Sequence, residues 1–295
     1  MDLLDTIYTC QSRQDWYREY ASTNGYPDLD FVGSAHLSNS PREVANEIRT
    51  KLGFGIAERA SFRSWQEALR RLIDRIEGLG VLVMVNGVVG ADTHRKLKPE
   101  EFRGFALSDT LAPLIFINGA DTKAAQIFTM VHELGHIWLG ESALSDAAMA
   151  DSTDNAAELW CNRVAAEVLV PLTTIRDEYI GEPTVAELER LARRYRVSTL
   201  VILKRLYDTQ FLTWDDYQSR YDTELQRVIA AMRSRGSESG GNFYNTHPLR
   251  LSRQFARAVI TDTLEGGTPY RDAYQLLGTK KHQTFENLVA EIGAA

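Results

Sequence analysis

The first eighty residues place their hydrophobic side chains at helical spacing. In the stretch 11–21, Trp16 and Tyr20 lie one turn apart, which predicts a first helix. Two later helices are predicted to begin at Ser40 and Ser64, where a hydroxyl cap is followed three residues later by a glutamate that can reach back to it. In the first of these helices the apolar residues repeat every four positions (Val44, Ile48 and Leu52). In the second they follow the i, i+3, i+4, i+7 pattern of one helix face (Leu69, Leu72, Ile73 and Ile76).

Three short apolar runs follow, at 81–85, 105–107 and 114–117. They are too short for helices and typical of strands. From Thr122 onward the hydrophobic pattern is helical again. It predicts helices over 122–139 and 155–170 and further helices that begin at Thr184 and Ser198. We therefore expect an α+β fold that is mainly helical, with a small sheet near the middle.

The composition changes near the C-terminus. The run 237–241, Ser-Glu-Ser-Gly-Gly, has the composition of a flexible hinge, and the residues after it form an apolar stripe from 251 to 264 and a new helix start at Thr268. We predict four segments along the chain: an N-terminal helical segment, a core domain, a helix-turn-helix-like region and a C-terminal helical extension (1–39, 40–180, 181–235 and 236–295).

The overall composition is that of a folded globular protein. The chain has 295 residues, 44% of them hydrophobic, and a formal net charge of -7, which excludes a disordered chain and a wide phosphate-binding face. Two cysteines, Cys10 and Cys161, are too few for a disulfide framework and fit a reducing compartment. The apolar runs are strand-sized, against about 20 residues for a membrane span, and no secretion signal is recognisable. We expect a cytoplasmic protein with no membrane partner.

The strongest chemical signal is the run His132-Glu133-Leu134-Gly135-His136. Histidines four residues apart lie one turn apart on the same helix face, so both imidazoles can reach one metal ion. Glu133 is angled away from direct ligation and can act as the general base that holds the attacking water. The alternative is a buried helix whose two histidines hydrogen-bond to backbone carbonyls.

A hydrolytic zinc ion needs a third protein ligand and keeps its fourth position for water. Glu158 lies 22 residues after His136, far enough for a loop and a returning helix, and Asn162, one turn later, can orient a ligand. Glu158 can equally cap its own helix from within 155–158, and spacing alone leaves both interpretations open. The rival carboxylates are Glu141, Asp146 and Glu167.

Three blocks of sequence together resemble the ImmA/IrrE family of metallopeptidases. They are EFRGFAL at 101–107 with APLIFIN at 112–118, FTMVHELGH at 128–136, and ELWCNRVAAEVLVP at 158–171. The resemblance covers roughly residues 40 to 235. In the third block Cys161 replaces the usual alanine and Val170 the usual methionine. The resemblance implies that Glu158 is the third metal ligand, beside His132 and His136.

The resemblance also implies a zincin-like, thermolysin-resembling core in 40–180 and a zinc-dependent endopeptidase. The cofactor is then Zn2+, with Mn2+ as the alternative, because two histidines and a carboxylate accept either. Members of the family are cytoplasmic and cut helix-turn-helix repressors, which switches on mobile-element or stress-response genes. The expected partner is therefore a repressor or antitoxin-like regulator encoded nearby. We expect an extended substrate segment to add to an open sheet edge at 114–117.

Residues 184–208 have the pattern of a helix-turn-helix, with the turn at 196–198 and with Lys204 and Arg205 expected to face solvent. The basic face is thin and the chain is acidic, so two packed helices are preferred over a DNA-binding unit. The competing function is a non-proteolytic, metal-stabilised regulator that binds DNA or a repressor. A zinc hydrolase of small peptides is a second alternative.

Overall fold

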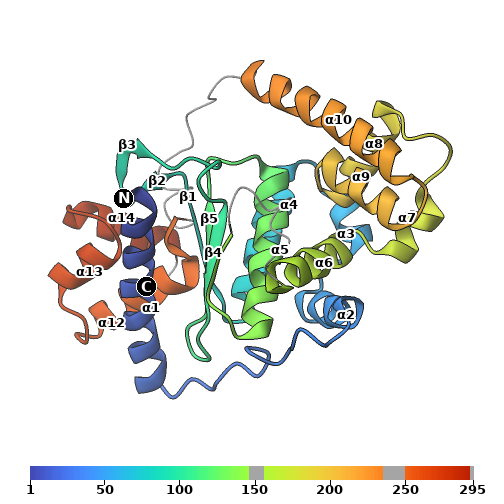
Figure 1. Ribbon diagram of the computed structural model, residues 1–295. Coiled ribbons are helices and arrows are strands. Elements are labelled where there is room, and N and C mark those ends of the chain that lie inside the picture. Colours follow the sequence, from blue (N-terminus) through green and yellow to red (C-terminus); the bar gives the residue numbers. More distant parts are fainter. Residues whose placement is uncertain (146–155, 235–249, 293–295) are drawn as a thin grey trace.

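The computed structural model describes residues 1–145, 156–234 and 250–292 (Figure 1). The helices are α1 (Asp2–Thr23), α2 (Pro41–Leu52), α3 (Ile56–Ser61), α4 (Trp65–Glu77), α5 (Lys123–Leu139), α6 (Ala156–Leu169), α7 (Leu172–Glu178), α8 (Val185–Tyr195), α9 (Thr199–Asp208), α10 (Trp214–Ser234), α12 (Arg253–Leu264), α13 (Tyr270–Leu276) and α14 (His282–Ile292). The strands are β1 (Leu82–Asn86), β2 (Val88–Val89), β3 (Asp92–Lys96), β4 (Gly104–Leu107), β5 (Leu114–Asn118) and β6 (Ala143–Ser145). The expected mainly helical α+β fold is confirmed.

Four strands form a mixed sheet in the order β1-β5-β4-β6, and β2 and β3 form a separate hairpin. β1 runs parallel to β5, while β4 is antiparallel to both β5 and β6. The expectation of a free edge at 114–117 was wrong, because β5 pairs on both sides and all five of its residues are buried. A continuous apolar run is typical of an interior strand, which has no free hydrogen-bonding edge.

Alternation along the strands separates two hydrophobic cores. On β5, Ile115 and Ile117 face the core that contains α4 and α5, while Leu114 and Phe116 face the core on the other side of the sheet. The second core is closed by α1 and by the C-terminal helices, which lie side by side over that face (Figure 1). The two ends of the chain therefore cover the same face of the sheet.

Helix starts follow the local capping signals. The hydroxyls of Ser64, Thr122, Thr184 and Ser198 each accept a hydrogen bond from the backbone N–H three residues later. Ser40 precedes α2 as predicted but makes no such side-chain bond. The first helix is longer than the predicted 11–21. Its buried stripe consists of Thr6, Cys10, Gln14, Tyr17 and Ala21, and the polar residues Thr6 and Gln14 in this stripe hide the hydrophobic spacing of the first half.

Two features expected from the sequence lie outside the described residues: the hinge at 237–241 and the weak helical segment at 146–155. Within the described part of the chain, no helix combines the length and the apolar character needed to cross a bilayer.

Candidate metal centre

The helix α5 carries both histidines through the interior of the molecule. It begins after Thr122, whose hydroxyl accepts from the N–H of Ala125 at 3.2 Å, and it ends at Gly140 in the left-handed region. Nearly every residue from 126 to 138 is buried, because the sheet covers one side of the helix and α4 and α6 cover others (Figure 1). His132 and His136 are 0% and 1% exposed. The motif therefore lies in a position shielded from bulk solvent.

The donor atoms of two histidines and one carboxylate converge. Nε2 of His132 and Nε2 of His136 are 3.1 Å apart. The two carboxylate oxygens of Glu158, from α6, lie 3.0 Å from the His132 nitrogen and 3.1 Å from the His136 nitrogen. Among the described residues, these three form the one group of histidine, cysteine and acidic side chains placed closely enough to hold a metal ion.

The spacing of this triangle fits a divalent cation. With zinc–ligand bonds of about 2.0–2.1 Å, the ligand atoms of a tetrahedral site are about 3.3–3.4 Å apart, a few tenths of an ångström from the distances here. Two imidazole nitrogens facing each other at 3.1 Å place two lone pairs together unless a proton or a cation lies between them. Histidine nitrogens and a carboxylate are also a donor set that zinc accepts.

Asn162 and the local burial favour the protonation states that such a site needs. The Asn162 side-chain oxygen lies 3.0 Å from Nδ1 of His132, so Nδ1–H donates to it and Nε2 keeps its lone pair for the site. Burial lowers the pKa of His132, which keeps the imidazole neutral. Burial raises the pKa of Glu158, but the two histidine rings that face its carboxylate outweigh this and hold its pKa below the usual value.

Two glycines allow the elements around the site to approach closely. A Cβ on Gly104 of β4 would lie 2.8 Å from the carbonyl oxygen of Phe116 and 3.2 Å from a carboxylate oxygen of Glu133. A Cβ on Gly135 of α5 would lie 3.2 Å from Sγ of Cys161 on α6. Gly104 therefore lets the sheet pack against the Glu133 carboxylate, and Gly135 lets α6 bring Glu158 to the histidines.

The rival carboxylates lie away from the two histidines or outside the described residues. Glu167 is buried at the far end of α6 and pairs with Arg205. Glu141 is exposed, and Asp146 lies outside the described residues, as does Asn155 of the alternative capping pattern. Sequence reasoning missed the packing role of Gly104 and Gly135, although both stand inside the blocks that carry the family resemblance.

Comparison with known proteins gives two family matches and one relative. Residues 76–207 match the model of the IrrE N-terminal-like domain, and residues 251–291 match a domain of unknown function (DUF8813). Over 122 residues the chain is 36% identical to the radiation response metalloprotease IrrE of Deinococcus radiodurans. This alignment covers 39% of the chain and 36% of the relative, so the chain spans about a third of the length of the curated relative it matches.

Two facing imidazoles on one buried helix and a carboxylate on the next, packed beside a small sheet, are the arrangement of a metallopeptidase domain. The match of residues 76–207 to the IrrE N-terminal-like domain identifies the family of this domain. Residues 76–207 therefore form a domain of the ImmA/IrrE family, as the three sequence blocks within this stretch predict.

Proposed function

We propose that the protein is a zinc-dependent endopeptidase that cuts a protein partner at a defined site. The observation that carries the proposal is the triangle of His132, His136 and Glu158, whose donor atoms are 3.0–3.1 Å apart around one point. The three side chains come from two helices that are separate in sequence, which makes a chance arrangement a poor explanation. The proposal includes a thermolysin-resembling core within 40–180 and a cytoplasmic location.

In this proposal the three side chains hold the ion, and Asn162 orients His132 through Nδ1. When bound, zinc acts as a Lewis acid that lowers the pKa of a coordinated water and polarises a peptide carbonyl. Glu133, buried beside the first histidine, accepts the proton of the attacking water and delivers it to the leaving nitrogen. The packing of Gly104 against Glu133 limits where that carboxylate can point.

The substrate segment is proposed to add to the outer edge of β6. β1 and β6 are the two edges of the sheet, and β6 pairs with β4, the strand whose Gly104 faces Glu133. β1 lies on the other side of β5, farther from the motif. An extended peptide that pairs with β6 is bound through its backbone, which gives affinity with little demand on its side chains.

The proposed partner is a helix-turn-helix repressor or antitoxin-like regulator, as the family resemblance implies. Helices α8 and α9 form the predicted helix pair, with Arg196 in the left-handed region at the turn. The prediction that Arg205 faces solvent was wrong: the side chain is buried against Glu167. One basic group is thereby lost from the face that DNA recognition would use, so the protein substrate is preferred over direct DNA binding.

The decisive test is Glu133→Gln. The purified protein is incubated with the repressor encoded beside it, with and without a chelator, and the fragments are identified by mass spectrometry. We expect site-specific cleavage that the chelator and the substitution each abolish, while the variant keeps its bound metal, because Glu133 is not a ligand. Cleavage by the variant at the wild-type rate would refute the mechanism. If the protein instead acts by binding and sequestering the repressor, the Glu133→Gln variant should keep its biological effect.

A further inference from the structure

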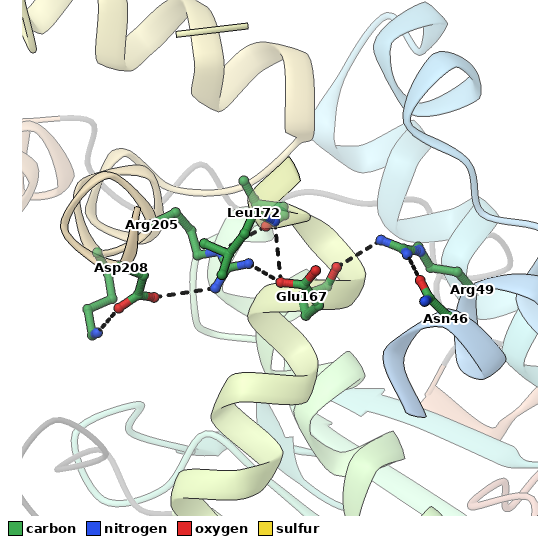
Figure 2. Close-up of polar contacts among 8 residues, drawn as sticks. Asn46, Arg49, Glu167, Leu172, Arg205 and Asp208 are labelled. Carbon is green, nitrogen blue, oxygen red and sulfur yellow. Dashed lines mark hydrogen bonds and ion pairs between the residues drawn. The ribbon is translucent and has the colours of Figure 1, made fainter. Parts of the chain in front are cut away.

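The helix α6 carries two carboxylates on opposite sides, Glu158 partly buried and Glu167 buried. Glu158 lies near its beginning, and Glu167 follows nine residues later, which is about two and a half turns and about 13 Å along the axis. Glu158 therefore faces the histidines of α5, while Glu167 faces α9. There its carboxylate pairs with the guanidinium of Arg205, and both side chains are about 5% exposed (Figure 2).

Three arginines from three different helices hold the end of α6. Arg49 of α2 donates to the carbonyl of Glu167 at 3.0 Å. Arg59 of α3 donates to the carbonyl of Leu169 at 2.8 Å, and Arg205 of α9 donates through Nε to that of Val170, also at 2.8 Å. The last carbonyls of a helix have no partner within it and carry its negative end, so positive donors are favourable there.

Arg205 makes more of these contacts than either of the others. It binds the backbone at Val170 and the Glu167 carboxylate at the same time, and its other nitrogen lies 3.3 Å from Asp208 (Figure 2). The Glu167 carboxylate also accepts from the N–H of Leu172 at 3.3 Å, where the chain turns into α7. A planar guanidinium bound at two points of one helix end restricts both the rotation of that helix and its shift along its axis.

Stability alone does not explain a buried ion pair at this place. Removing two charges from water is costly, and replacing such a pair by apolar side chains of similar size is often neutral or stabilising. Apolar side chains, unlike an ion pair with directional hydrogen bonds, do not fix the orientation of the helix about its axis. Glu158 must keep its oxygens at 3.0–3.1 Å from two fixed nitrogens, and a rotation of α6 moves that carboxylate away from them.

We propose that Arg205 and Glu167 are a positioning pair for the metal ligand Glu158: by fixing the far end of α6 to α9, they hold the Glu158 carboxylate in reach of both histidines. The inference rests on the proposed metal site and adds residues to it that touch neither metal nor substrate. It also gives the helix-turn-helix-like pair a role in the peptidase itself.

The test measures metal binding and needs no substrate. Zinc affinity is determined by competition with a chromogenic chelator, and the visible spectrum of the Co2+-loaded protein reports the ligand geometry. The main variant replaces both charges, Glu167→Leu with Arg205→Met, because a single substitution leaves an uncompensated buried charge that threatens the fold. Glu167→Gln, which keeps the shape of the side chain, is measured in parallel. Urea unfolding of each variant is measured without metal.

The matched control is Glu224→Gln. Glu224 is equally buried; it accepts a hydrogen bond from Thr199 of α9 and pairs with Arg227 of its own helix, α10, so these polar contacts join α10 to α9 and do not involve α6. We expect the double variant and Glu167→Gln to bind zinc about tenfold more weakly with an altered Co2+ spectrum, and the control to match the wild type. Wild-type affinity in the folded variants, or an equal loss in the control, would overturn the positioning role. A wild-type protein that binds no metal would instead overturn the metal site.

Discussion

The approach of α5 to α6 at Gly135 leads to a sharp test of the site geometry. In Gly135→Ala the new Cβ lies 3.2 Å from Sγ of Cys161, whereas nonbonded atoms prefer about 3.5–4.0 Å. Relief of this contact requires the helices to separate by roughly 0.5 Å. Ligand distances of a metal site tolerate only about 0.2 Å, so we expect zinc affinity to fall about tenfold.

The effect of Gly135→Ala on folding is expected to be much smaller than its effect on the metal. Alanine in a helix interior gains about 1 kcal/mol over glycine, while overpacking a core costs about 1–3 kcal/mol. The free energy of unfolding without metal should therefore lie between the wild-type value and about 2 kcal/mol below it. Urea unfolding measures this quantity, and competition with a chromogenic chelator measures zinc affinity on the same preparation.

A second substitution tests whether the contact with Sγ of Cys161 is the cause of the lower zinc affinity. Cys161→Ala removes the sulfur, and the nearest atoms to the new Cβ are then Cβ and Cα of residue 161 at 3.4 and 3.5 Å, ordinary contacts. The double variant should regain most of the zinc affinity, and Cys161→Ala alone should keep it. Unchanged affinity in Gly135→Ala, or a double variant as weak as the single one, would refute the packing argument.

Two further predictions concern a metal ligand and a buried carboxyl. Glu158→Gln should lower zinc affinity by about 100-fold or more with the helical content of the apoprotein unchanged, and equal metal content after dialysis would contradict its role as a ligand. Burial raises the pKa of Glu77 from its ordinary value of 4.5 to about 7, although Ser252 and Arg253 donate hydrogen bonds to its carboxylate. The folded state thus holds this proton to higher pH than the unfolded chain, so stability falls as pH rises from about 4.5 to 7, and Glu77→Gln should remove that part of the slope in urea unfolding.

The helix starts and the placement of two histidines on one helix face are local features, and they can be predicted from the sequence. Ser64, Thr122 and Ser198 cap the helices that follow them, because a cap depends only on residues within one turn. The two histidines of α5 converge for the same reason, since they stand on a single helix.

Features that depend on distant parts of the chain could not be predicted in this way. Spacing left Glu158 open between cap and ligand, because the histidines reach it only through the packing of α6 on α5. Arg205 was expected in solvent, although Ile202 and Leu206 beside it already mark a buried face; its partner Glu167 lies 38 residues away. The strand β6 has three residues, too few for a periodic signal, and exists through its pairing with β4.

The contacts between α1 and the C-terminal helices bear on the order in which the protein folds during synthesis. Arg13 of the first helix donates to the carbonyl of Leu276 at 3.0 Å, and Trp16 packs its ring edge-on against Phe255. While synthesis has reached only residue 250, Leu114 and Phe116 still lack the helices that cover them. This face of the sheet is covered only after residues 251–288 have been synthesised, and until then the growing chain exposes apolar surface that favours aggregation.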